Sequence, residues 1–176
     1  MRLSRLVSDM LELSRLQSGT ASLTRSMFSP LPLLSIIHET YSAYAEDYQQ
    51  TFIYDVPDSL PQVTGNPDRT QQVLIALLDN AFKYTPEGGT VTLSAAQEGG
   101  VVRVTVRDTG IGIGPEDLPH VFDRFYKADK SHHSRGTGLG LAIAYEIMKH
   151  LGEEMTVESE PGRGSRFCFT LHIAKN

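Results

Sequence analysis

Apolar residues recur every three or four positions over the first 18 residues of the chain. Leu3, Leu6, Met10 and Leu13 lie three, four and three positions apart, which places them on one face of an α-helix. A helix this short does not form a coiled coil by itself, so we expect its apolar face to pack against partner helices in a bundle. A serine and a glycine end the pattern, and residues 19–29 are predicted to be a polar linker.

Helical and strand-like patterns alternate along the rest of the chain. Helical spacing predicts three more helices, over residues 30–50, over residues 67–84, and from the glycine cluster at 136–140 to about residue 151. Apolar runs and alternation predict strands over residues 51–56, 90–96, 101–108, 153–159 and 165–173. The last four strands are expected to form two hairpins, and residues 57–67 a turn-rich loop.

The helix predicted over residues 67–84 has two adjacent stripes. Its core face consists of Val73, Leu74, Leu77, Leu78 and Ala81. The neighbouring stripe, at intervals of four, three and four, consists of Ala76, Asn80, Lys83 and Tyr84. The second stripe is therefore expected to present its polar residues together.

The strand predicted over residues 101–108 ends in a carboxylate on its apolar side. Because side chains alternate across a strand, Asp108 falls on the same face as Val102, Val104 and Val106. A carboxylate facing the core is costly unless a partner pairs with it, and the glycines at 110, 112 and 114 would let a ligand approach closely. The stretch is equally ordinary turn chemistry, so a ligand loop and an Asx-type turn both stay open at this point.

Composition and charge narrow the classes of function. The formal charge is −5, with 21 acidic and 16 basic residues, which argues against nucleic acid as the main partner. The lone cysteine, Cys168, excludes an internal disulfide and fits a reducing compartment. No apolar run approaches the ~20 residues of a membrane helix, and we expect this piece of chain to be cytoplasmic.

The glycine cluster at 136–140 is a second candidate ligand loop. Backbone N–H groups at a helix start bind anions. The cluster is neither a P-loop, because no lysine follows the glycines, nor the dinucleotide fingerprint. Residues 115–135, between the two glycine clusters, form a charged loop of a length that is usually functional or mobile.

Four motifs in a fixed order carry a family resemblance. They are NAFKYTP at 80–86, DTGIGI at 108–113, FDRFYK at 122–127 and GTGLGL at 136–141. The combination closely resembles the ATP-binding catalytic domain of sensor histidine kinases, over residues from about 28 to 173. Residues 4–15, SRLVSDMLELSR, resemble the end of the second helix of that family's dimerisation hairpin.

The resemblance implies an α/β (α+β) two-layer sandwich of the Bergerat type. Its sheet would be mixed and mostly antiparallel with helices on one face, preceded by a truncated helix of a helical hairpin. The expected organisation is the end of the dimerisation and phosphoacceptor hairpin over residues 1–18, a linker over 19–29 and the ATP-binding domain over 30–176.

The resemblance also implies a role for each motif in binding ATP and Mg²⁺. Asp108 would accept a hydrogen bond from the adenine amino group, and Asn80 would bind magnesium through its amide oxygen. Lys83 would reach a phosphate, and Tyr84 would pack near the base or ribose.

The glycine-rich motifs and the loop between them would complete the nucleotide site. Gly110 and Gly112 would line the adenine floor, and residues 115–135 would form a lid. The second cluster would bind the triphosphate through Gly136, Thr137, Gly138, Leu139 and Gly140. Further candidate phosphate contacts are Arg124, Lys127 and Arg135.

The sequence departs from the family pattern in two places. Ala76 stands one turn before Asn80, where related sequences often have asparagine and gyrase-type ATPases have a water-activating glutamate. The methyl group of an alanine can neither bind a metal nor activate water. This favours phosphoryl transfer over ATP hydrolysis, and it is expected to weaken metal binding. The family's phosphoacceptor motif, a histidine followed by an acidic residue, arginine and proline, does not occur.

The resulting hypothesis is a kinase domain that transfers the γ-phosphate of ATP to a histidine on a hairpin missing from this chain, for relay to an aspartate of a response-regulator receiver domain. No residue would have a covalent role; Asn80 and Lys83 would position the phosphates. The full-length protein would dimerise through the hairpin and be anchored in the cell membrane by upstream segments. Two alternatives remain, a Bergerat-fold ATPase or anti-sigma-type serine kinase and a non-catalytic nucleotide-binding scaffold.

Overall fold

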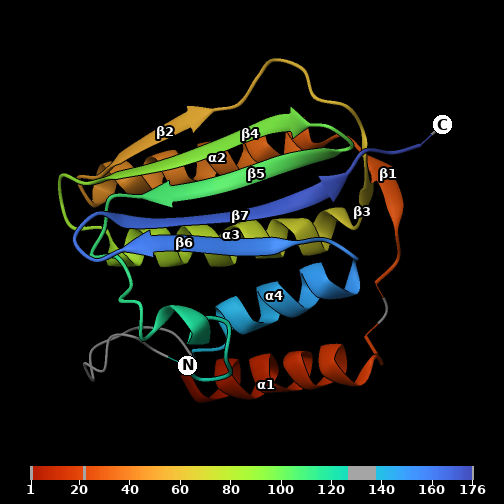
Figure 1. The fold of residues 1–176 in the computed structure, drawn as a ribbon, viewed down its shortest axis with the longest axis horizontal. Helices are drawn as coiled ribbons and strands as arrows, with labels where there is room; N and C mark the ends of the chain where they lie inside the picture. Colours follow the sequence, from red (N-terminus) through yellow and green to blue (C-terminus); the bar gives the residue numbers. More distant parts are fainter. Residues whose placement is uncertain (1, 22, 127–137, 176) are drawn as a thin grey trace.

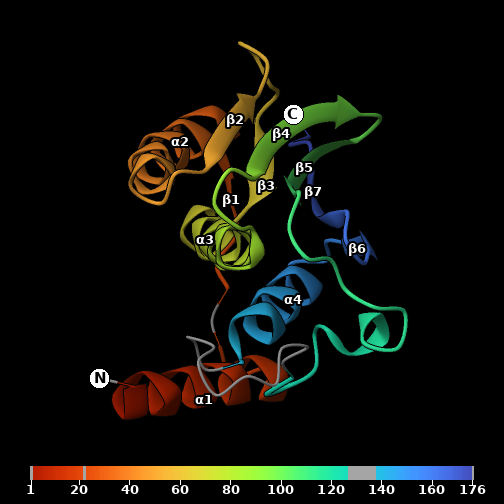
Figure 2. The ribbon, with the colours of Figure 1, turned by 90° about the vertical axis from the view of Figure 1, so that its left-hand side faces the viewer.

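The computed structural model describes residues 2–21, 23–126 and 138–175. The helices are α1 (Arg2–Ser18), α2 (Pro30–Asp47), α3 (Pro67–Tyr84) and α4 (Gly140–His150), with a short 3-10 helix at Leu118–His120. The strands are β1 (Ser26–Phe28), β2 (Thr51–Asp55), β3 (Val63–Gly65), β4 (Thr90–Glu98), β5 (Val101–Asp108), β6 (Met155–Glu160) and β7 (Gly164–His172). Figure 1 shows the strands β2, β4, β5, β7 and β6 side by side in one sheet, and Figure 2 shows α2, α3 and α4 on one face of this sheet.

The main sheet is mixed and mostly antiparallel, as predicted. Its five strands lie in the order β2-β4-β5-β7-β6, and only the β2–β4 pair is parallel. Val106 of β5 lies opposite Leu93 of β4 and Phe167 of β7. All three are buried, which confirms the alternation predicted for these strands.

The α3 helix forms where the sequence predicts it and buries the predicted face. Asn66 caps its N-terminus by accepting a hydrogen bond from the Arg69 backbone N–H at 3.0 Å, and Pro67 occupies the first helical position, where no N–H donor is needed. The buried core face contains Val73, Leu74, Leu77, Leu78 and Ala81. Because the core face of α3 is buried along the helix, the neighbouring stripe with Asn80, Lys83 and Tyr84 faces a fixed side of the molecule.

Two short strands differ from the prediction. Residues 19–29 were predicted to be a linker, yet β1 lies within them, and β3 lies within the predicted loop at 57–67. The two strands pair antiparallel, with Phe28 opposite Val63. Three-residue strands show no readable alternation, and their partners are far apart in sequence, so only tertiary pairing reveals them.

The α1 helix packs on α4 within this chain (Figure 1). Leu13 and Leu16 are buried, whereas Leu3 and Leu11 are exposed by 74% and 53%. The C-terminal half of the predicted apolar stripe therefore has an internal partner. None of the helices in the described ranges is long and apolar enough to span a bilayer.

Candidate functional site

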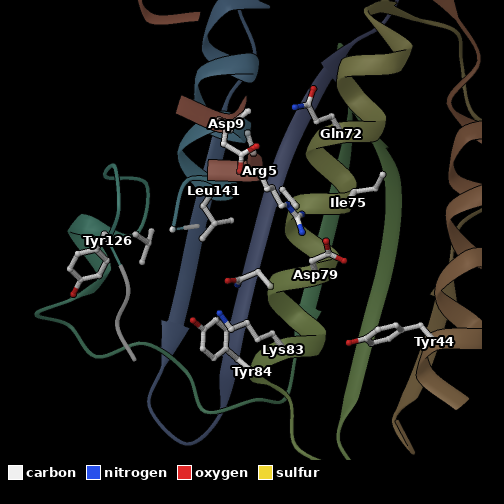
Figure 3. Close-up of a pocket in the computed structure, with 17 residues that line it drawn as sticks. Arg5, Asp9, Tyr44, Gln72, Ile75, Asp79, Lys83, Tyr84, Tyr126 and Leu141 are labelled. Atoms are coloured by element: carbon white, nitrogen blue, oxygen red, sulfur yellow. The ribbon is translucent and has the colours of Figure 1, made fainter. Parts of the chain in front are cut away.

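A cavity of about 410 Å³ lies between α1, α3 and α4. Figure 3 shows the cavity, with Asp79, Lys83 and Tyr84 along α3 and with Leu141 near the start of α4. The sequence-predicted site residues that line it are Asn80, Lys83, Tyr84, Gly138 and Gly140. Folding therefore brings together two motifs that are more than fifty residues apart.

The α3 side of the cavity is the polar stripe predicted from the sequence. Ala76 lines the cavity one turn before Asn80, with no functional group to offer. Lys83 and Tyr84 lie side by side in the last turn (Figure 3), with the Lys83 Nζ 5.1 Å from the centre of the Tyr84 ring. This wall offers an amide, a cation and an aromatic ring.

The α4 side of the cavity is a helix N-terminus. Gly138 has a positive φ of 77°, a conformation that glycine adopts without strain, and α4 begins at Gly140. The first backbone N–H groups and the helix dipole therefore favour an anion in this part of the cavity.

Asp108 ends β5 with a buried carboxylate that is 3% exposed. Its Oδ1 accepts hydrogen bonds from the backbone N–H groups of Gly110 at 2.9 Å and Ser165 at 3.3 Å. Burial raises the pKa of the Asp108 carboxyl, and these two hydrogen bonds oppose the rise. The bond to Gly110 is an Asx turn, so the turn predicted as a rival to the ligand loop is present at Oδ1.

The glycine loop after Asp108 is packed against the end of α3. The Ile111 N–H donates to the Tyr84 carbonyl at 3.2 Å. A Cβ atom at Gly110 would lie 2.3 Å from that same carbonyl oxygen, so only glycine fits here. Asp108, Gly110 and Gly112 do not line the cavity themselves; they adjoin it through Tyr84.

The turn between β6 and β7 supports this loop from the other side. Gly112 has a φ of 73°, and a Cβ there would lie 2.1 Å from the Glu160 carbonyl oxygen. The Ile113 N–H donates to Ser159 Oγ at 2.7 Å. Gly112 therefore contacts protein backbone closely, and this packing is a sufficient reason for the glycine at that position.

Two other sequence-predicted site residues that the structure describes, Arg124 and Leu139, do not line the cavity. Arg124 donates a hydrogen bond to the Gln17 side chain of α1 and does not line the cavity. Lys127, Arg135, Gly136 and Thr137 lie outside the described residues, and Leu139 is buried beneath the start of α4.

The cavity also contains residues that the sequence analysis did not single out. Arg5 and Asp9 line it from α1, and Asp79 lines it from α3. Figure 3 shows the Arg5 side chain extending from α1 toward α3. No motif or spacing in the sequence directs α1 to this cavity, so only the docking of α1 could reveal Arg5 and Asp9.

Asp79 is held by a buried tyrosine. The Tyr41 hydroxyl of α2 donates to Asp79 Oδ1 at 2.6 Å. Burial raises the pKa of Tyr41 strongly, and the hydrogen bond to Asp79 adds to the rise. The tyrosine therefore stays protonated and holds the carboxylate at the rim of the cavity.

The cavity has charges of both signs. Arg5, Lys83 and the α4 N-terminus supply positive potential, Asp9 and Asp79 supply negative charge, and Asn80 offers an amide oxygen. In the described ranges no group of three or more His, Cys, Asp or Glu side chains could hold a metal ion. A metal here would depend on few protein ligands and on the anion itself, as Mg²⁺ commonly does.

Comparison with known proteins agrees with this geometry. The protein-family model described as histidine kinase-, DNA gyrase B-, and HSP90-like ATPase matches residues 65–175. The sensor histidine kinase WalK of Bacillus subtilis (strain 168) is 38% identical over 174 residues, which are 97% of this chain and 28% of that protein. The chain thus spans less than half the length of the curated relatives it matches.

Solved structures share the whole fold. The structure of full-length ShkA in complex with AMPPNP superposes with a TM-score of 0.85 at 32% identity, covering 99% of this chain and 37% of that one. The catalytic domain of the histidine kinase ThkA, in a nucleotide-free form, gives a TM-score of 0.74 at 25% identity, covering 85% and 97%. The family match, the sequence identity and the shared fold together show that the chain belongs to the histidine kinase-, DNA gyrase B- and HSP90-like ATPase family, as a domain of the sensor histidine kinase type.

Proposed function

We propose that this chain binds Mg-ATP and presents the γ-phosphate to a histidine outside this sequence, as the kinase domain of a two-component sensor. The observation that carries the proposal is that Asn80, Lys83 and Tyr84 of α3 line the same cavity as Gly138 and Gly140 at the start of α4. The AMPPNP bound to the full-length ShkA structure supports a nucleotide ligand.

Each side of the site would bind one part of the nucleotide. Asp108 would accept a hydrogen bond from the adenine amino group on Oδ2, since both of its hydrogen bonds within the described residues go to Oδ1. Lys83 and the α4 N-terminus would bind the phosphates. Asn80 would contribute its amide oxygen to a magnesium ion that otherwise keeps water and phosphate ligands.

The chain's contribution to phosphoryl transfer would be positioning and charge neutralisation. Phosphoryl transfer asks for little covalent chemistry from the protein, and Asn80 and Lys83 supply the amide and the cation. Ala76 lines the cavity one turn before Asn80, at the position where the resemblance to gyrase-type ATPases would place a water-activating glutamate. This favours transfer to a separate acceptor over hydrolysis.

The experiment is titration calorimetry of the purified chain with Mg-ATP. We expect binding by the wild type and its loss in Asp108→Asn, because an amide can keep the Oδ1 turn but places N–H donors where the adenine amino group must donate. The control is Asp55→Asn on the exposed end of β2, which should bind like wild type. No heat of binding with the wild type would refute the proposal.

A second candidate is a nucleotide-binding scaffold without transfer, and Ala76 is the observation that favours it. Mixing the chain with ATP and a dimerisation hairpin that carries an acceptor histidine separates the two. Acid-labile phosphate on the hairpin supports the kinase, and binding without any phosphorylated hairpin supports the scaffold. Neither candidate predicts phosphorylation of the chain by itself.

The proposed setting follows from the relatives. We propose a response-regulator receiver domain as the partner, as the sensor kinases among the relatives suggest. We also propose a homodimer through the hairpin to which α1 would belong, supported by the exposed Leu3, Val7, Met10 and Leu11. The domain would act in the cytoplasm, and any membrane anchor would be supplied by segments outside this sequence.

A further inference from the structure

The helix that carries the polar stripe ends with a local hydrogen bond that reaches only the Ala81 carbonyl, from Thr85 Oγ1 at 2.6 Å. Thr85, the C-cap residue of α3, is extended (φ −96°, ψ 122°), and Pro86 follows it. A glycine in the left-handed conformation, which commonly satisfies the last carbonyls of a helix, is absent at this end. The carbonyl groups beside Lys83 and Tyr84 therefore depend on other segments for hydrogen bonds.

Gln50 provides two of these hydrogen bonds. Its Nε2 donates to the carbonyl oxygens of Phe82 at 3.0 Å and of Thr85 at 2.5 Å. Gln50 lies in the turn between α2 and β2, and its own backbone N–H donates to the Ala45 carbonyl at 2.9 Å. The preceding residue, Gln49, has a φ of 55° and accepts a hydrogen bond from the Gly88 N–H at 2.8 Å.

The orientation of the Gln50 carboxamide is determined by these contacts. A flipped amide would direct Oε1 at two carbonyl oxygens, which cannot donate. In the present orientation Oε1 is buried and has no hydrogen-bond partner in the described part of the chain. An unsatisfied buried oxygen is unfavourable, so the two bonds from Nε2 must outweigh it.

The Asp108 loop provides a further hydrogen bond to the same helix end. The Ile111 N–H donates to the Tyr84 carbonyl at 3.2 Å. The last turn of α3 is thus fixed by Gln50 and by the Asp108 loop. Its position determines how the phosphate side of the site faces the base side.

We infer that Gln50 is a positioning residue of the nucleotide site: its carboxamide caps the end of α3 and thereby sets Asn80 and Lys83 relative to the Asp108 loop. The inference rests on the proposed binding of Mg-ATP. Gln50 itself does not line the cavity, so it acts through α3 and touches no nucleotide.

The test compares Gln50→Met, which keeps the length and loses the donor, with Gln50→Glu, which replaces the donor by an acceptor. We expect Mg-ATP affinity to fall by about tenfold in Gln50→Met and further in Gln50→Glu. The matched controls are Gln97→Met and Gln97→Glu at the exposed C-terminal end of β4, which should leave the affinity unchanged. Titrations are run well below the melting temperature of each variant, determined by circular dichroism.

A second readout separates positioning from a loss of general stability. Wild type should bind ATP more tightly with magnesium than with EDTA, and this ratio should shrink in Gln50→Met, while adenosine affinity changes less. Equal affinities in wild type and Gln50→Met would overturn the inference, as would a fall of equal size for all three ligands. If wild type binds no Mg-ATP, the proposed function fails instead.

Discussion

The two oxygens of the Asp108 carboxylate have different surroundings. Oδ1 accepts two backbone hydrogen bonds, which makes the Asx turn and aligns the side chain. No hydrogen bond from the described residues reaches Oδ2. Asp108 can therefore stabilise the turn through Oδ1 and bind a ligand through Oδ2. The Asx-turn and ligand-loop interpretations of this stretch do not exclude each other.

Burial of Asp108 predicts a pH-dependent stability difference. Because the pKa is raised in the folded state, the favourable contribution of this group is present below its ordinary pKa and is lost as pH rises through the raised value. Without nucleotide, Asp108→Asn should therefore be at least as stable as wild type at neutral pH, and its advantage should shrink on acidification. Thermal melts between about pH 4 and pH 8 check this; an advantage that grows toward acid pH would contradict it.

Gly110 permits the close approach of two site segments. Its Cβ position lies 2.3 Å from the Tyr84 carbonyl oxygen, so Gly110→Ala should force the Asp108 loop away from α3. We expect a loss of about 1–3 kcal/mol in unfolding free energy and weaker Mg-ATP binding. The control is Gly100→Ala, where a Cβ would meet no atom within 4 Å. Denaturant melts and calorimetry measure both effects.

Helix α3 is the element that connects most parts of the site. Its N-terminus is capped by Asn66, whose Nδ2 also donates to the Thr24 carbonyl at 3.0 Å. Its C-terminus is held by Gln50 and Ile111. The sequence predicts where this helix runs, which face it buries and that it ends before Pro86, but not which groups bind its last carbonyls, because Gln50 and Ile111 come from other elements.

The Asn66 contacts can be separated by two substitutions. Asn66→Ala should lower the unfolding free energy by about 1–2 kcal/mol through loss of the cap. Asn66→Asp keeps the capping oxygen and adds a favourable charge at the helix N-terminus, while it replaces the donor to Thr24 by an acceptor, so it should cost less than Asn66→Ala. Melting curves give both values, and equal losses in the two variants would show that the cap contributes nothing. Mg-ATP affinity should not change, since Asn66 lies at the opposite end of α3 from Lys83 and Tyr84.

At the scale of the whole molecule, α1 joins the cavity by packing on α4. Leu13 and Leu16 are buried there, and Glu12 accepts hydrogen bonds from Arg69 and Gln72 of α3. The Glu12–Arg69 ion pair is partly exposed, so it is expected to contribute at most about 1 kcal/mol. The buried leucines therefore dominate the docking.

Removing both leucines should release α1 locally. In a variant with Leu13→Ala and Leu16→Ala, we expect faster amide hydrogen exchange in α1 and α4 and unchanged exchange in β4 and β5. A variant with Leu3→Ala and Leu11→Ala, both exposed in this structure, is the control. Faster exchange throughout the sheet would show that α1 is part of the cooperative core, contrary to this prediction.

The sequence by itself determined the order of the long helices and strands, the buried face of α3 and the side of β5 on which Asp108 lies. It could do so because these properties follow from the local period of side chains, 3.6 residues in a helix and two in a strand. The motifs were also sufficient to indicate the family, since their residue types and order are local features.

Only the tertiary structure decided which of these residues meet. It brought Asn80, Lys83 and Tyr84 to Gly138 and Gly140, directed Arg124 to α1 instead, and placed Arg5 and Asp79 in the cavity. It also made Gln50 the cap of α3 and paired β1 with β3. These are contacts between segments far apart in sequence, and no local period encodes which distant surface a side chain will face.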